Sequence, residues 1–398
     1  MASVLFEDQQ IPRALLRERA YNHRWAETGR GVIPLTAADP DFKVAPEIRQ
    51  AIARYTDEGL FSYGPARGLP ELRTALVRDL SSSGYAGLDV DRILPLDGAA
   101  SCMHAVARAF LSEGDEMIVL DPVDFLFEEA AQRAGAKIKR CPYNPASGDF
   151  PLETLETLVS RRTRMIGICN PHNPLGRFMR EDELEAFARF AEEHDLWILN
   201  DEVWREIVFS PHEFCSFHHL PASLRKRVIS IHGFSKSHGL AGLRIGTIAT
   251  PDPETHATIL EASGVMTTAG GASTLSQIAA TAALEECRDW VDAFVLHLSG
   301  LRDLAVERLN AMPGIRCESP EATFLLFPDI RETGLDAEAL ADFLARKARV
   351  AVIPGTPRFF GPGAAGHIRL SFATSEKLLE RALDRIEHAL KQLVPSAH

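Results

Sequence analysis

The sequence has no long apolar run, no excess of positive charge and no apolar segment at its N-terminus. Its 398 residues include 43 lysines and arginines against 55 aspartates and glutamates, a formal net charge of -12. This balance argues against binding to nucleic acid or to an anionic membrane. No stretch approaches the roughly 20 apolar residues that span a bilayer, and the N-terminus lacks the apolar centre of a signal peptide. We therefore expect a cytoplasmic protein.

Paired cysteines and metal-binding patterns are also lacking. The six cysteines are scattered without any Cys-x-x-Cys pair, and the 14 histidines show no His-Glu-x-x-His spacing. Free thiols in a reducing compartment explain the cysteines best, and we expect no metal site. The composition, with 45% hydrophobic and 25% charged residues, is that of an ordinary globular protein.

The order of apolar runs predicts an α/β fold. Strand-like runs alternate with helical patterns at residues 93–96, 117–120, 137–141, 165–169, 196–199 and 228–231. Such alternation indicates a mostly parallel sheet with helices on both faces, and ligands of such sheets bind beyond the carboxyl ends of the strands. We expect an N-terminal segment, 1–45, packed with the small domain, a large domain, 46–284, and a small C-terminal α/β domain, 285–398, with strands near 323–327, 350–353 and 368–372.

The densest group of small and polar residues lies between two strand-like runs, at residues 232–246. Lys236 falls on a turn there, and Ser235 and Arg244 could both reach one anion, because the fork of arginine suits phosphate. A lone lysine in a turn is usually solvated. A lysine beside a phosphate site in a partly dry pocket, however, can lose its proton and form a Schiff base, most commonly with phosphorylated pyridoxal.

Ser235-Lys236 and the following Gly-Leu-Ala-Gly-Leu-Arg-Ile-Gly resemble the cofactor-lysine segment of class I/II aminotransferases, the fold-type I pyridoxal-phosphate enzymes. The resemblance implies that Lys236 carries pyridoxal 5'-phosphate (PLP) and that Ser235 and Arg244 anchor its phosphate. Gly233 stands where a serine is often found, so this anchor is one hydroxyl short.

Two further segments match the phosphate site of that family. Gly98, Ala99 and Ala100 open a predicted helix, where free backbone N–H groups favour a dianion, and they match the family's phosphate-cradling turn. Tyr63, in a Tyr-Gly loop, either packs against its own loop or, as in the family, donates a hydrogen bond to the phosphate of the cofactor bound by the partner subunit. The second alternative implies a homodimer with shared active sites.

Four positions are assigned to the cofactor ring by the resemblance. Asp201 ends an apolar strand, where a carboxylate is costly unless it meets a cation; the family's aspartate pairs with the pyridine nitrogen. Asn173, in Asn-Pro-His-Asn-Pro-Leu-Gly, matches the donor to the phenolic oxygen. Trp204 falls where aminotransferases have tyrosine and the β-lyase branch has histidine. Asp124 occupies the usual place of the ring-stacking aromatic residue, and Phe125 takes that role if the turn is offset by one residue.

The substrate contacts come from both ends of the chain. Ala38, in Ala-Ala-Asp-Pro-Asp-Phe, matches the small residue whose backbone lies beside the substrate carboxylate. Arg369 matches the arginine that binds the α-carboxylate through a bidentate pair, and Asn173 borders the same space.

The leading hypothesis is an aminotransferase that moves an amino group between an L-amino acid and a 2-oxo acid. An alternative is a PLP-dependent carbon-sulfur β-lyase, which Ala38-Asp39 and His172 favour and which Trp204 and Asp124 disfavour. A third hypothesis is a racemase or an arginine-modifying enzyme. A non-enzymatic sensing module would usually carry a DNA-binding segment, for which 398 residues leave no room.

Overall fold

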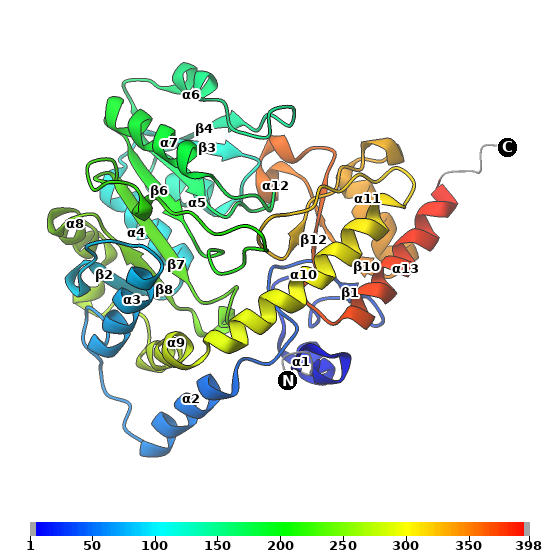
Figure 1. Cartoon of the computed structure of the whole chain (residues 1–398), viewed down its shortest axis with the longest axis horizontal. Helices are drawn as coiled ribbons and strands as arrows, with labels where there is room; N and C mark the ends of the chain where they lie inside the picture. Colours follow the sequence, from blue (N-terminus) through cyan, green and yellow to red (C-terminus); the bar gives the residue numbers. More distant parts are fainter. Residues whose placement is uncertain (1–4, 394–398) are drawn as a thin grey trace.

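A seven-stranded sheet forms the centre of the molecule (Figure 1). The computed structural model describes residues 5–393. The spatial order of the strands is β2-β8-β7-β6-β5-β3-β4, and every neighbouring pair is parallel except those that involve β8. The strands are β2 (Ile93–Leu96), β3 (Glu116–Asp121), β4 (Lys137–Pro142), β5 (Thr163–Cys169), β6 (Trp197–Asp201), β7 (Val228–Gly233) and β8 (Gly246–Ala249).

The two faces of this sheet bury alternate residues of the same strands. Met117 and Val119 of β3 belong to the apolar cluster that contains α4 and α5, whereas Ile118 and Leu120 belong to the cluster that contains α7. Side chains of a strand point alternately to opposite faces, so apolar runs without alternation predict a strand covered on both sides. The predicted α/β fold is confirmed.

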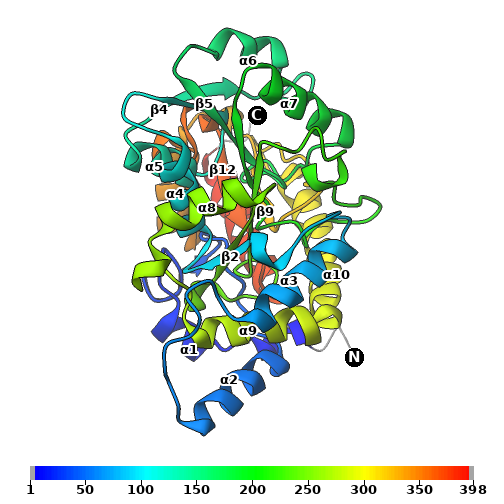
Figure 2. The ribbon, with the colours of Figure 1, turned by 90° about the vertical axis from the view of Figure 1, so that its left-hand side faces the viewer.

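The helices around this sheet are α3 (Pro70–Ser82), α4 (Ala99–Phe110), α5 (Leu126–Arg133), α6 (Leu152–Leu158), α7 (Glu181–Glu193), α8 (Pro253–Ser263) and α9 (Thr274–Glu286). Figure 2 shows α4 and α8 next to one another. Short 3-10 turns include η3 (Val90–Arg92), η4 (Phe217–His219) and η5 (Ala241–Leu243).

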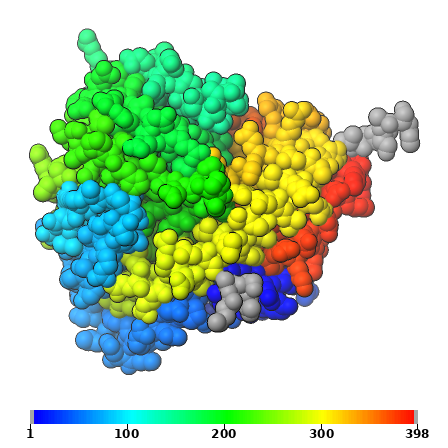
Figure 3. Space-filling view, viewed as in Figure 1, coloured from blue at the N-terminus to red at the C-terminus, as the bar shows by residue number. Residues whose placement is uncertain are grey.

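The C-terminal part of the chain forms a smaller sheet. Its three strands are antiparallel, in the order β11 (Ile353–Pro354), β12 (Ile368–Ser371) and β9 (Leu325–Leu326). The long helix α10 (Arg288–Asn310) starts beside α9 and packs against α13 (Glu376–Leu393), and the space-filling view shows it along the boundary between the two parts (Figure 3). The remaining helices here are α11 (Ala337–Phe343), α12 (Pro357–Phe360) and a π-helical turn, Leu344–Ala348.

The N-terminal segment contacts this smaller part. β1 (Ile33–Pro34) pairs in parallel with β10 (Val350–Ala351). Helix α1 (Arg13–Arg19) precedes it, and α2 (Pro46–Glu58) follows and ends at Gly59, whose φ of +71° suits glycine. The predicted domain boundaries at residues 45 and 284 stay predictions.

A buried ion pair, which the sequence did not reveal, fixes the segment before α2. The guanidinium of Arg24 binds the carboxylate of Asp41, and Trp25 Nε1 donates to the same carboxylate over 2.6 Å. Both charged side chains are almost fully buried, and removing one partner of such a pair typically costs about 3–5 kcal/mol.

Within residues 5–393, no helix combines the length and the apolar character that crossing a bilayer requires. The same part of the chain holds no cluster of three or more histidine, cysteine, aspartate or glutamate side chains arranged to bind a metal ion.

Candidate active site

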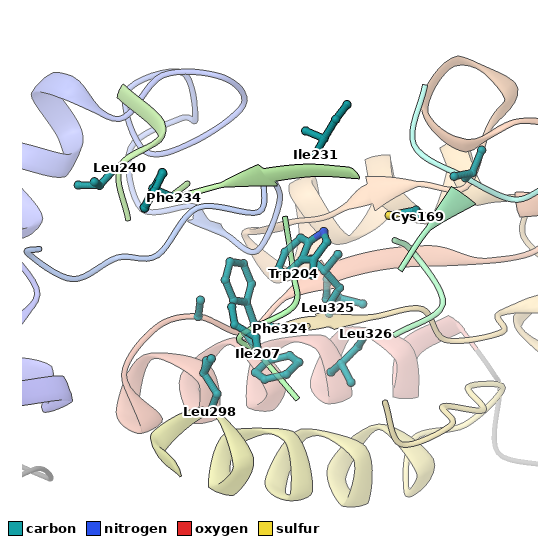
Figure 4. Close-up of a cluster of buried hydrophobic side chains, with 14 of the residues drawn as sticks. Cys169, Trp204, Ile207, Ile231, Phe234, Leu240, Leu298, Phe324, Leu325 and Leu326 are labelled. Atoms are coloured by element: carbon teal, nitrogen blue, oxygen red, sulfur yellow. The ribbon is translucent and has the colours of Figure 1, made fainter. Parts of the chain in front are cut away.

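Lys236 lies on the loop that connects β7 to the antiparallel strand β8. Leu240 N–H donates to the carbonyl of Phe234 over 3.1 Å and closes the first half of this loop, and the side chains of both residues are buried (Figure 4). The Lys236 amine donates to the carbonyl of Ala38 over 2.8 Å and lies 5.2 Å from the ring centroid of Trp204. The structure thus brings together Lys236, Ala38 and Trp204.

Burial lowers the pKa of the Lys236 amine, and the negative charges of Asp39 and Asp124 partly oppose this effect. Desolvation disfavours the charged form of a lysine, whereas a nearby carboxylate favours it. The net direction makes the neutral amine more accessible than in solution. A neutral amine is the form that attacks a carbonyl or accepts a proton.

Asp201 is the last residue of β6 and the most unusual charge in this region. Its side chain is 8% exposed, and its Oδ1 accepts a hydrogen bond from Val203 N–H over 3.1 Å. No lysine, arginine or histidine among the described residues forms an ion pair with it. Burial raises its pKa to about 7, which the Val203 hydrogen bond only partly offsets. Lys236 lowers the pKa only slightly, so a cation in direct contact, which residues 5–393 do not supply, would stabilise this carboxylate.

Gly98 and Arg244 lie against each other at the start of α4. Gly98 has a φ of +117°, and a Cβ there would come within 2.9 Å of the Arg244 guanidinium. A Cβ on Gly246 would lie 2.5 Å from Ala99 N, so β8 and the start of α4 touch through their backbones. The guanidinium and the free N–H groups of a 12-residue helix therefore meet at one point, which suits a doubly charged anion.

Arg369, on β12, approaches this group from the smaller sheet, close enough for its charge to act on Lys236. Its Nη1 donates to Asn173 Oδ1 over 3.0 Å and its Nη2 to the carbonyl of Thr36 over 3.2 Å. Its guanidinium carbon lies 5.0 Å from the ring centroid of Phe360. The side chain is 7% exposed, its Nε has no partner, and burial lowers its pKa to about 10. A buried guanidinium with a free donor is prepared for a carboxylate.

Asn173 and Asp124 complete this side of the pocket. Asn173 Nδ2 donates to Asp124 Oδ2 over 2.8 Å, so Asp124, Asn173 and Arg369 form one hydrogen-bonded chain. The sequence marked Asp124 only as a departure from the usual aromatic residue. Its neighbour Phe125 is 43% exposed and donates its backbone N–H to Phe359.

Tyr63, Phe125 and Ser235 are among the predicted site residues whose side chains make no hydrogen bond with this group. Tyr63 is 91% exposed, and Phe125, whose side chain has no polar atom, is 43% exposed. Ser235 precedes Lys236 and is half-buried, without a hydrogen bond from its hydroxyl to another described residue. Their assigned roles stay predictions.

A second buried carboxyl group belongs to Glu202, the residue after Asp201, and the sequence analysis did not identify it. Glu202 accepts hydrogen bonds from Tyr85, from Asn200 Nδ2 over 2.6 Å and from Ser216 Oγ over 2.6 Å. Burial raises the pKa of this carboxyl to about 8, partly opposed by the Ser216 hydrogen bond. A glutamate directly after an apolar strand was the only available signal.

Comparison with known proteins decides the family. The family model described as aminotransferase class I and II matches residues 30–386. The chain belongs to the class I and II aminotransferases. An aspartate aminotransferase of Pyrococcus horikoshii is 32% identical over 370 residues, which cover 90% of this chain and 91% of that protein. The arginine–pyruvate transaminase AruH of Pseudomonas aeruginosa is 33% identical over 376 residues, or 93% of each chain.

The fold of this aminotransferase also matches solved structures. The crystal structure of an aromatic aminotransferase from Pyrococcus horikoshii superposes with a TM-score of 0.85 at 32% identity, covering 92% of this chain and 98% of that one. The protein is therefore a PLP-dependent aminotransferase, as its cofactor-lysine segment implied. The matched proteins are named for different substrates, so family membership does not fix the amino acid used.

Proposed function

We propose that this aminotransferase holds PLP between Lys236, Asp201 and the start of α4, and that Arg369 binds the α-carboxylate of an amino acid substrate. The observation that carries this proposal is Asp201. It is a buried carboxylate that lacks a cation, and it lies in the same pocket as an amine whose pKa is lowered. A group with an aldehyde at one end and a basic ring nitrogen at the other fits both.

The residues present fit each part of PLP. The contact of Gly98 with Arg244 leaves no room for a side chain and offers backbone donors together with a guanidinium for the phosphate. Asn173 Nδ2 keeps a second hydrogen atom beside the one given to Asp124, which can serve the phenolic oxygen. When bound, PLP supplies an electron-accepting ring for the electrons of the substrate Cα–H bond.

The protein contributes positioning and proton transfer. Arg369 orients the substrate through its carboxylate, with Thr36 and Asn173 fixing the guanidinium. Asp201 keeps a proton on the ring nitrogen. The Lys236 amine accepts the α-proton at Nζ and returns it, a role that requires the lowered pKa described above.

We further propose a homodimer with shared active sites. Tyr63 is 91% exposed, the preceding Leu60 and Phe61 are exposed large apolar side chains, and Phe61 lines the same hollow as Tyr63. Exposed apolar groups of this size usually mark an interface. In a dimer, Tyr63 would reach the phosphate of the PLP that the partner subunit binds.

Borohydride reduction of the PLP-loaded protein tests the proposal. Reduction should fix the cofactor on one peptide, and mass spectrometry should place the added mass on Lys236. Lys236→Ala should remove this label and lower the amino-transfer rate by at least 10³-fold, because no amine remains to move the α-proton. A label on another lysine, or unchanged activity of the variant, would contradict the proposal.

A single-turnover experiment separates transfer from elimination. Mixed with amino acids but without any 2-oxo acid acceptor, a transaminase should convert its cofactor once to the amine form. Continued release of ammonia and pyruvate from cysteine conjugates would instead indicate a β-lyase.

A further inference from the structure

Asp124 is close enough for its charge to act on both Lys236 and Arg369, the proposed cofactor and carboxylate groups. It follows β3, and it is joined to Arg369 through the amide of Asn173, over 2.8 Å and 3.0 Å. Its negative charge favours the charged forms of both Lys236 and Arg369, against the burial that disfavours them. An amino acid whose carboxylate binds Arg369 would therefore lie within reach of the charge of Asp124, one amide away.

The charge of Asp124 has no direct counter-ion among the described residues. No described lysine, arginine or histidine forms an ion pair with it, and Arg369 balances its charge through the amide of Asn173. Once a substrate carboxylate binds Arg369, the positive charge of Arg369 is neutralised by the substrate and no longer compensates Asp124. The buried Nε of Arg369, which has no partner, points to such a ligand.

A second carboxylate, that of Asp39, belongs to the residue after Ala38, whose carbonyl accepts a hydrogen bond from Lys236 over 2.8 Å. Burial raises its pKa, and the charges of Arg24 and Lys236 oppose this, but neither forms an ion pair with it. Arg24 is instead committed to Asp41. When the amine of Lys236 is bound to the cofactor, Asp39 loses part of its compensation as well.

We propose that Asp124, supported by Asp39, makes this enzyme select amino acids with a positively charged side chain and reject dicarboxylic amino acids. This inference rests on the proposed function, in which Arg369 takes the α-carboxylate. Like charges that approach in a partly dry pocket repel strongly, and such repulsion is an effective means of rejecting a competing ligand. A positive side chain would instead supply the missing counter-charge.

Matched pairs of substrates test the inference. Purified enzyme loaded with PLP is mixed with lysine or its uncharged analogue norleucine, and with glutamate or glutamine, and the rate of the first half-reaction is followed. Lysine should react at least tenfold faster than norleucine, and glutamate at least tenfold slower than glutamine. Asp124→Asn should bring both ratios toward one, whereas Asp124→Glu should retain the preference for lysine over norleucine.

Asp342→Asn is the matched control, because Asp342 is exposed on α11, far along the chain from this pocket. Both ratios should stay unchanged in this variant. Binding of unreactive acids gives a readout that does not depend on turnover. By calorimetry, 6-aminohexanoate should bind the wild-type enzyme at least tenfold more tightly than hexanoate, and adipate should bind most weakly. Asp124→Asn should lose these differences, and Asp39→Asn should reduce them.

The outcomes distinguish the two proposals. If the enzyme reacts with amino acids but prefers glutamate to glutamine, or if Asp124→Asn keeps the wild-type ratios, the inference is wrong and the proposed function stands. If no amino acid changes the cofactor and borohydride labels no residue, the proposed function itself fails.

Discussion

Asp201 shows how one buried charge can connect folding with cofactor binding. In the protein without PLP, burial raises its pKa from 3.8 to about 7. The folded form therefore holds a proton that the unfolded chain has already lost between these two pH values. Its contribution to stability is fully present below about pH 4 and falls as the pH rises toward 7.

We predict that Asp201→Asn stabilises the cofactor-free protein in a pH-dependent way. An amide has no proton to lose, so the variant should become more stable than the wild type by a further ~2 kcal/mol between pH 5 and pH 8. Urea unfolding at both pH values measures this difference. The same variant should bind PLP more weakly, because an amide cannot neutralise the ring nitrogen. Asp195→Asn, at an exposed position, serves as control. If the difference in free energy of unfolding between Asp201→Asn and the wild type did not change with pH, the prediction would be wrong.

At the scale of single residues, the sequence predicted the groups that belong to spaced motifs. Lys236, Asn173, Asp201 and Arg369 could be named because their neighbours fix the pattern, and the structure brings them into one pocket. The partners of these residues could not be named. Asp124 binds Asn173 across 49 positions of the chain, and only the folding of the chain brings two such positions together.

The strands and helices were the most predictable part of the molecule. The first strand of the large sheet occupies residues 93–96, as expected, because its apolar run is bounded on both sides by charged or small residues. β6 is longer than the prediction of 196–199: it starts at Trp197 and continues to Asp201, since Asn200 and Asp201 are buried polar residues that an apolar pattern does not count. The predicted strand 350–353 is divided between two sheets, with β10 pairing to β1 and β11 to β12.

The contact between β8 and α4 provides a test at the level of elements. Gly246→Ala would place its Cβ 2.5 Å from Ala99 N and 2.6 Å from the carbonyl carbon of Gly98, both of which are backbone atoms. We expect the strand and the helix start to separate, with a loss of about 1–3 kcal/mol in stability and weaker PLP binding. Thermal unfolding and PLP titration measure both effects.

Gly242→Ala is the matched control for this prediction. Gly242 lies in the same loop, and a Cβ there would meet nothing within 4 Å. If the two variants had equal stability and equal PLP affinity, the proposed contact would not matter for the cofactor.

For the whole molecule, the proposed dimer depends on the exposed apolar residues around Tyr63. Leu60→Asp should produce a monomer, because a carboxylate would be buried in the interface without a partner. It should also weaken PLP binding, since Tyr63 of the partner subunit is then withdrawn. Sedimentation velocity and PLP titration are the measurements.

The control for this change is Leu296→Asp on α10. Leu60 and Leu296 are both 71% exposed, but Leu296 lies far along the chain from the Tyr63 loop. The control should keep the oligomeric state of the wild type. A Leu60→Asp variant that remains a dimer with full PLP affinity would show that this surface is not the interface.

Arg369 lies on the smaller sheet and Lys236 on the loop after β7 of the larger one, which has a mechanical consequence. An amino acid held by its carboxylate at Arg369 and by its amine at a cofactor on Lys236 would connect the two sheets. The spacing between the amine and the carboxylate is the same in every α-amino acid, so each substrate sets the same distance between the sheets. Only contacts with the side chain can therefore distinguish one amino acid from another.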